Sequence, residues 1–108
     1  KQGVAFQIAD LQVMATAARA LTYQAAWLKD AGRPMQEFKQ AASIAKLYSS
    51  EAAVTATRIA TQVGGGYGFM EENPMARFYR DAKILEIGEG TSEVQRMLIA
   101  RGLGLPVE

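Results

Sequence analysis

The sequence contains no cysteine and no histidine, and this excludes several kinds of site from its 108 residues. Without cysteine there is no disulfide, no thiolate nucleophile and no cysteine-ligated metal. Without histidine there is no Ser-His-Asp triad, no zinc site with imidazole ligands and no di-iron site of the Glu-x-x-His kind. The chemistry that remains belongs to carboxylates, hydroxyls, lysine, arginine, backbone amides and any bound cofactor, and we expect no metal.

The sequence also has no large excess of positive or negative charge and no long apolar run. Twelve basic and eleven acidic residues give a net charge of +1, so we expect neither nucleic acid nor an anionic membrane as a partner. No apolar run approaches the roughly 18 residues of a membrane-spanning helix. The length allows one domain, and the first amphipathic pattern begins without a capping residue. This indicates a piece cut from a longer protein.

Alanine is concentrated in the first part of the chain and glycine in the last part, which predicts a helical first part and a loop-rich second part. Apolar residues at three- and four-residue steps predict one long helix over 4–28 and another over 35–62. Between them, Gly32 suits a left-handed cap and Pro34 cannot continue a helix. A short link of this kind predicts an antiparallel helical hairpin.

Shorter helices are expected in the last third of the chain. Asn73 followed by Pro74 is typical of a helix start, and predicts a short helix over 75–82. Ser92 with Gln95 matches a capping box that opens the last helix. We therefore expect an all-α, up-and-down helical bundle of two long antiparallel helices plus shorter C-terminal helices. Two long helices cannot enclose a core alone, so the bundle should pack against other domains or subunits.

The glycine cluster of Gly64, Gly65, Gly66 and Gly68 has two interpretations. It lacks the G-x-G-x-x-G spacing and follows a predicted helix, so it is not a dinucleotide-binding fingerprint. It can be a helix C-cap with a tight turn, and it is then expected to end the second long helix. It can also bring backbone close to a ligand such as a phosphate.

Glu89 lies between Gly88 and Gly90, just before the last predicted helix. It can be a solvated carboxylate of a connector. It can also be a general base on a mobile loop, with the backbone amides of a helix start close by, if a dry pocket raises its pKa. The residues alone leave both interpretations open.

Three segments together resemble the C-terminal part of an acyl-CoA dehydrogenase: Gln62 to Gly68, Arg77 to Ile84 and Glu89 to Arg96. The resemblance extends over essentially the whole chain. That family is a flavoprotein with an N-terminal helical domain, a middle β domain and a C-terminal helical domain, and residues 1–108 resemble the last of these. The resemblance implies a homo-oligomer, dimer or tetramer, whose C-terminal helices pack at its centre.

The same resemblance implies a reaction. Members of the family carry out α,β-dehydrogenation of an acyl-CoA thioester, in which a glutamate removes the α-proton and the β-hydrogen passes as hydride to FAD. Electron-transferring flavoprotein usually reoxidises the flavin. The implied location is the cytoplasm for a bacterial protein and the mitochondrial matrix for a eukaryotic one.

Roles for individual residues follow from the resemblance only. Glu89 takes the place of the base, its backbone N–H that of an oxyanion donor, and Gly90 leaves room for the thioester. Arg101 corresponds to a position near substrate in some relatives. The positions implied to contact FAD are Gln2, Gln62, Val63, Gly64, Gly65, Gly66, Thr91, Ser92 and Glu93, of which Gln62 to Gly66 would contact the FAD of a neighbouring subunit.

One departure from the family pattern keeps alternatives open. Gly88 stands where the family often has tyrosine, and this resembles branched-chain members whose base lies upstream, although those members lack the glutamate found here at position 89. Two other functions also remain. One is a non-catalytic helical module that oligomerises, and the other is a relative of the acyl-CoA oxidase or nitroalkane type that uses oxygen.

Overall fold

The computed structural model describes residues 1–107, and every regular element in that range is helical. The elements in chain order are α1 (Gln2–Asp30), α2 (Met35–Phe69), α3 (Pro74–Lys83), the single 3₁₀ turn η1 (Ile84–Glu86) and α4 (Ser92–Gly102). The prediction of an all-α chain with two long helices and shorter C-terminal helices is therefore confirmed. Glu108, the last residue of the predicted domain, lies outside the described residues.

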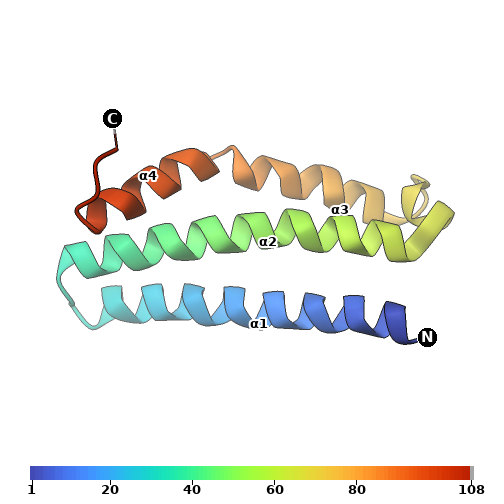
Figure 1. The fold of residues 1–108 in the computed structure, drawn as a ribbon, viewed down its shortest axis with the longest axis horizontal. Coiled ribbons are helices and arrows are strands. Elements are labelled where there is room, and N and C mark those ends of the chain that lie inside the picture. The colour runs from blue at the N-terminus through green and yellow to red at the C-terminus, as the bar shows by residue number, and fades with distance from the viewer. Residues whose placement is uncertain (108) are drawn as a thin grey trace.

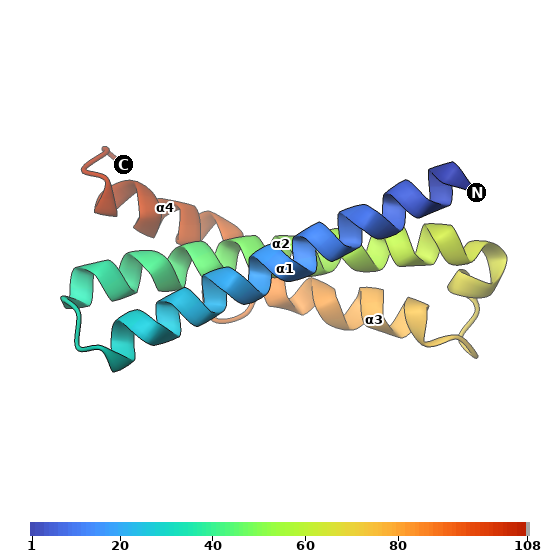
Figure 2. The same ribbon diagram turned by 90° about the horizontal axis from the view of Figure 1, so that it is seen from below.

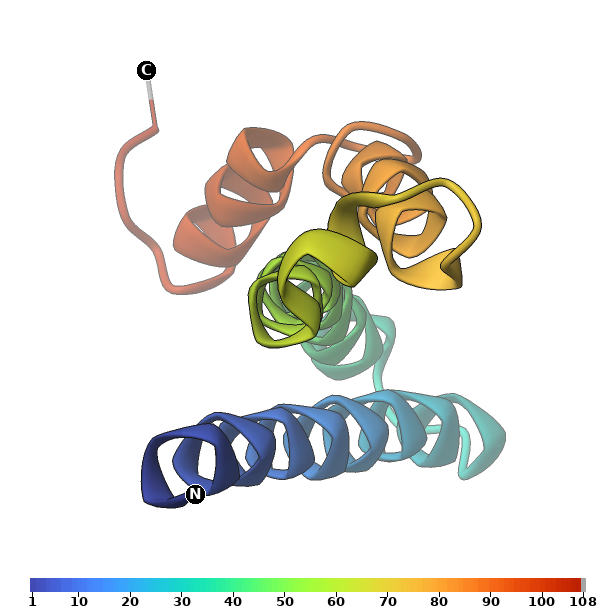
Figure 3. The same cartoon turned by 90° about the vertical axis from the view of Figure 1, so that its right-hand side faces the viewer.

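The helix α2 is the centre of the bundle. It runs antiparallel to α1 on one side, and α3 and α4 follow one another along its other side (Figure 1). Viewed end-on, α2 lies between α1 and the α3–α4 pair (Figure 3). The helix α1 crosses α2 at an angle, so its two ends diverge from the rest of the bundle (Figure 2). The helices α3 and α4 therefore cover the predicted antiparallel hairpin of α1 and α2 only on the α2 side.

The core of this bundle is thin. Its buried apolar residues are all alanines, Ala25, Ala45, Ala52 and Ala82, and no large side chain of the described residues is fully buried. On α1, Phe6, Tyr23 and Trp27 are 60%, 67% and 63% exposed. The radius of gyration is 16.4 Å, whereas a compact domain of this size has about 13 Å. The aromatic side chains of α1 are therefore left largely uncovered within this chain.

Two of the predicted helix boundaries are confirmed. Gly32 has a positive φ of 68°, and the N–H of Arg33 donates to the carbonyl of Leu28 at 3.1 Å, which closes the C-terminus of α1. The Oδ1 atom of Asn73 accepts from the N–H of Met75 at 3.0 Å, with proline at the first position of α3.

The predicted capping box at the last helix is wrong. The N-cap of α4 is Thr91, whose Oγ1 atom accepts from the N–H of Val94 at 3.2 Å. Gln95 instead turns back toward the preceding loop, where its side-chain amide donates to the carbonyl of Glu89 at 3.3 Å. Because the hydroxyl of Thr91 takes the capping position, the side chain of Gln95 is free for this longer-range contact.

The predicted break of the second long helix at the glycine cluster is found at Gly65, whose φ and ψ of 60° and −141° are not helical. What the sequence did not indicate is the short helical segment that follows the kink and extends α2 to Phe69. Only glycine adopts this backbone conformation without strain, so the chain changes direction within the element rather than at its end. The segment beyond the kink packs tightly, because a Cβ atom on Gly68 would stand 2.5 Å from the carbonyl oxygen of Thr61.

The kink yields a stability prediction with a matched control. Gly65→Ala places a side chain at a positive φ, and we expect it to lower the free energy of unfolding by about 1–2 kcal/mol. Gly66→Ala should leave it unchanged or raise it slightly, because Gly66 has no positive φ and nothing lies within 4 Å of its added Cβ. Urea unfolding of both ligand-free variants would measure this, and equal losses would contradict the role of Gly65.

Candidate functional site

Glu89 occupies an unusual backbone conformation in the connector, residues 85–90, which leads from within η1 to the start of α4. Its φ is 57°, and it is the only residue other than glycine with a positive φ in the described range of 1–107. Gly90 follows with a φ of 94°. A left-handed conformation of a non-glycine residue costs about 1–3 kcal/mol and persists only where its surroundings enforce it. The side chain of Glu89 is exposed in this chain, so it is available to a ligand.

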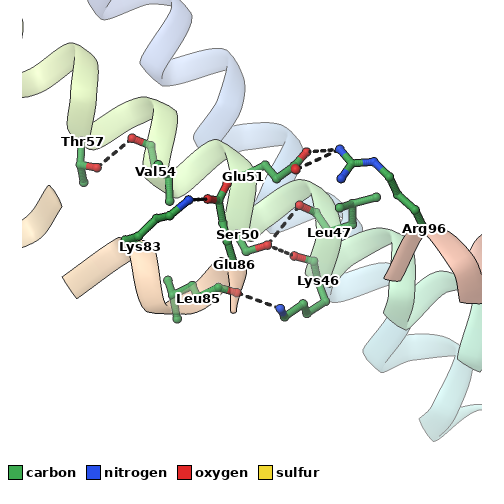
Figure 4. A network of polar contacts seen from close by, with 10 residues as sticks. All are labelled: Lys46, Leu47, Ser50, Glu51, Val54, Thr57, Lys83, Leu85, Glu86 and Arg96. Carbon is green, nitrogen blue, oxygen red and sulfur yellow. Dashed lines mark hydrogen bonds and ion pairs between the residues drawn. The ribbon is translucent and has the colours of Figure 1, made fainter. Parts of the chain in front are cut away.

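Two side chains from different helices hold this connector. From α2, Lys46 donates through its Nζ atom to the carbonyl of Leu85 at 2.8 Å and to the carbonyl of Gly90 at 2.6 Å. Figure 4 shows the first of these bonds, which crosses from α2 to the start of the connector. From α4, the amide of Gln95 holds the carbonyl of Glu89. The carbonyls of positions 89 and 90 are therefore both fixed.

Neither Lys46 nor Gln95 was predicted as a site residue. Lys46 is half-buried, and it is the one charged residue between positions 40 and 50, a stretch made mostly of small and apolar residues. A single charged residue in such a stretch is the sequence feature that could have indicated Lys46 as a site residue. Gln95 is only 7% exposed, and its Nε2 atom would stand 2.6 Å from a Cβ added to Gly90. Glycine at position 90 thus leaves the space that the Gln95 amide occupies.

Ion pairs flank the connector on both sides (Figure 4). Before it, Lys83 pairs with Glu86 at 2.6 Å, and the hydrogen bond and charge of Glu86 raise the pKa of Lys83. After it, Arg96 on α4 contacts both carboxylate oxygens of Glu51 on α2, at 2.8 and 2.9 Å. These pairs are largely solvent-exposed, so they orient η1 and α4 more than they stabilise the fold.

An apolar hollow of about 510 Å³ lies beside the connector. Glu89, Gly88, Ile84 and Leu85 form one wall, and α2 forms the other with Lys46, Ser49 and Ser50. A carboxylate at the edge of such a hollow can act on a mostly apolar molecule.

The start of α4 offers hydrogen-bond donors next to Glu89. Thr91 caps the N–H of Val94, so the amides of Ser92 and Glu93 remain as first-turn donors at the positive end of the helix. The hydroxyl of Ser92 is buried and has no hydrogen-bond partner among residues 1–107, whereas Glu93 is exposed. Ser92 as a whole is only 5% exposed, so its hydroxyl is not at the surface of this chain.

The other residues predicted to bind cofactor lie away from Glu89. Gln2 at the start of α1 and the segment 62–66 lie at the same end of the molecule, at the right of Figures 1 and 2. Position 62 is separated from Lys46 by about 24 Å of helix, at 1.5 Å per residue. The chain therefore does not bring these positions into one site with Glu89.

Backbone at the kink is open to approach from outside. An added Cβ on Gly65 or Gly66 would meet no atom within 4 Å, whereas Gly64 is covered by the side chain of Met75. Gln62 and Val63 are exposed. A hollow of about 790 Å³ lies beside this segment, lined by Arg58, Thr61, Gln62, Phe69, Met70, Glu71, Glu72, Ala76 and Tyr79.

Arg101 lies near the C-terminal end of α4, away from the connector. It is exposed and lines a separate hollow between α4 and the start of α2, next to Gln40 and Leu98. The predicted site residues are thus found in three places: the connector with the start of α4, the kink end, and the far end of α4. Within residues 1–107 no cluster of acidic side chains could hold a metal ion, and none of the helices is long and apolar enough to cross a membrane.

Comparisons with known proteins agree on one family. The family model described as "Acyl-CoA dehydrogenase, C-terminal domain" matches residues 1–104. Acryloyl-CoA reductase (NADH) of Anaerotignum propionicum is 49% identical over 100 residues, which cover 93% of this chain and 25% of that protein.

Solved structures with the same fold are also similar in sequence. Butyryl-CoA dehydrogenase from Megasphaera elsdenii superposes with a TM-score of 0.89 at 46% identity, covering 94% of this chain and 26% of that one. The FAD complex of PigA superposes with a TM-score of 0.91 at 30% identity, covering 97% and 27%. The chain therefore spans about a quarter of the length of the proteins it matches.

Proposed function

Because this chain belongs to the acyl-CoA dehydrogenase family, we propose that it is the C-terminal helical domain of an FAD-dependent enzyme that acts on acyl-CoA thioesters by α,β-dehydrogenation. An N-terminal helical domain and a middle β domain would complete the protein. The observation that carries the proposal is the conformation of Glu89, which is held at a positive φ beside an apolar hollow. A solvated connector carboxylate would need no such restraint.

In this proposal Glu89 is the base. Its carboxylate takes the α-proton of the thioester, which is only weakly acidic, so the negative charge that develops on the thioester oxygen needs a hydrogen-bond donor. The backbone N–H of Glu89 supplies one donor. Gly90 carries no side chain that would obstruct the thioester. The restrained connector keeps base and donor in a fixed relation, which lowers the entropic cost of reaching the transition state.

The residues present fit part of an FAD site. The exposed backbone at Gly65 and Gly66, with Gln62, Val63 and Gly64 beside it, would contact the cofactor of a neighbouring subunit, and Gln2 lies at the same end. The start of α4, with Thr91, Ser92 and Glu93, would contact the cofactor next to Glu89. A bound FAD would supply the hydride acceptor for the β-hydrogen. Arg101 would act nearer the substrate's periphery, because it lies at the far end of α4 from Glu89.

A titration of the full-length flavoprotein with acyl-CoA under anaerobic conditions tests the proposed function. We expect saturated acyl-CoA to bleach the yellow flavin absorbance in proportion to the substrate added. Electron-transferring flavoprotein should then restore the absorbance faster than oxygen does. Absence of bleaching by short, long and branched acyl-CoA thioesters would contradict the proposal, and rapid peroxide formation would favour the acyl-CoA oxidase alternative.

The reverse direction of the same reaction is a second candidate. A relative at 49% identity is named as an acryloyl-CoA reductase that uses NADH, so a close sequence can serve reduction of the double bond. In that direction Glu89 would return the proton to the α-carbon, and the same residues would act. Bleaching by NADH with a partner flavoprotein, followed by reoxidation with enoyl-CoA, would favour this candidate.

Homo-oligomer formation is proposed on the exposed apolar surface of α1. Phe6, Tyr23 and Trp27 are more than half exposed, which suits a buried position between subunits of a dimer or tetramer. Sedimentation of this chain measures its oligomeric state, and the same experiment with FAD tests the module alternative. Tight stoichiometric binding of FAD by this chain alone would contradict a non-catalytic helical module.

A further inference from the structure

We propose that Lys46 is a positioning residue for the base: its ammonium group ties together the two ends of the connector 85–90 and thereby holds Glu89 in its reactive orientation. This inference rests on the proposed role of Glu89. Lys46 itself contacts neither the carboxylate of Glu89 nor any reacting atom.

The geometry supports a clamp rather than a single contact. The Nζ atom of Lys46 bonds the carbonyl of Leu85 at 2.8 Å and that of Gly90 at 2.6 Å, so one cation joins the entry and the exit of the connector. The N–H of Gly88 donates to the carbonyl of Ile84 at 2.8 Å, within the same segment. The peptide groups 87–88 and 90–91 are therefore held, one on each side of the Gly88-Glu89-Gly90 segment.

The backbone of Glu89 needs this restraint. Its φ of 57° is unfavourable for a residue with a side chain, and without restraint the residue would relax toward an extended or right-handed conformation. Such a rotation would move the carboxylate and swing the peptide plane that carries the proposed oxyanion donor. The bond from Gln95 to the carbonyl of Glu89, at 3.3 Å, is long and uncharged, so the shorter bonds from the ammonium group hold the connector more strongly.

The surroundings of Lys46 point to the same role. Lysine is rarely withdrawn from water unless it is paired, yet Lys46 is half-buried and forms no ion pair with a carboxylate in the described part of the chain. Its hydrogen-bond partners are both carbonyls of the connector. A lysine that served only the packing of α2 would not need two acceptors at opposite ends of one loop.

The test compares Lys46→Met with Lys39→Met in the full-length flavoprotein. Both lysines lie on α2, but Lys39 is exposed and lines the hollow near the far end of α4, not the one beside the connector. We expect Lys46→Met to lower kcat by about tenfold, as displacement of a reacting group does, while KM for acyl-CoA and FAD content change far less. Lys39→Met should behave as the wild type.

A rescue experiment separates the charge from the packing. This chain has no cysteine, so Lys46→Cys can be alkylated with bromoethylamine to place an ammonium group at nearly the lysine length, once any cysteine outside these residues is replaced. Recovery of kcat after alkylation is expected. Lack of recovery in a folded, FAD-loaded protein would overturn the role of the ammonium group.

Amide hydrogen exchange gives a readout that does not depend on the proposed reaction. Lys46→Met should speed exchange in a peptide spanning residues 84–91, and Lys39→Met should not. Unchanged exchange there would overturn the clamp. Faster exchange with unchanged kcat would overturn its positioning role. If Glu89→Gln remained fully active, the proposed base would fail while the exchange result still reported on the clamp.

Discussion

Glu89→Gln is expected to lower kcat for acyl-CoA dehydrogenation in the full-length protein by about 10²–10⁴-fold, the usual contribution of a positioned general base. Glutamine has nearly the same shape as glutamate. The substitution leaves the backbone N–H of residue 89 in place, and the amide of Gln95 can still donate to the carbonyl of that residue. Glutamine cannot take a proton. FAD content and acyl-CoA binding should therefore persist while bleaching of the flavin by substrate is lost, which stopped-flow absorbance measures directly.

A nearby carboxylate provides the control for this variant. Glu86→Gln removes a carboxylate three positions away, one that pairs with Lys83, whose side chain is 58% exposed. Loss of an exposed pair contributes little, so kcat should fall by less than about threefold. Normal bleaching in the Glu89→Gln protein would instead place the base upstream of residue 1, as in the branched-chain members that the Gly88 position resembles.

Gly90→Ala is expected to lower kcat by about 10²-fold, because a displacement near the reacting groups is costly even when the fold survives. The new Cβ atom would stand 2.6 Å from the Nε2 atom of Gln95, on a residue whose φ is 94°. Relief of this overlap requires movement of the Gln95 amide, which is the group that holds the carbonyl of Glu89. The substitution would therefore disturb the hydrogen bond that holds Glu89, the residue next to position 90.

Gly88→Ala is the matched control on the other side of Glu89. Its added Cβ would meet only the carbonyl oxygen of Ile84 at 3.4 Å, an ordinary contact, and Gly88 has no positive φ. Activity close to that of the wild type is expected. Steady-state kinetics of both variants, together with their melting temperatures, would measure this. Equal losses of kcat in the two variants would argue against a specific role for the space at Gly90.

Much of the fold could be predicted from local patterns. The apolar spacing predicted both long helices, and the link at Gly32 and the cap at Asn73 were placed correctly, because each depends on residues only a few positions apart. The helical segment after the kink in α2 and the cap of α4 were not. Glycine can kink a helical element as readily as end it, and a threonine just before Ser92 competes for the same cap.

The sequence by itself determined that the chain is helical, that it lacks histidine and cysteine chemistry, and that Glu89 stands in a motif of a flavoprotein family. Only the tertiary structure decided what holds Glu89. Lys46 reaches Leu85 and Gly90 across 39 and 44 positions, because α2 packs against the connector. The spacing of neighbouring residues cannot predict such a contact, because the contact forms only when segments far apart in the sequence pack together.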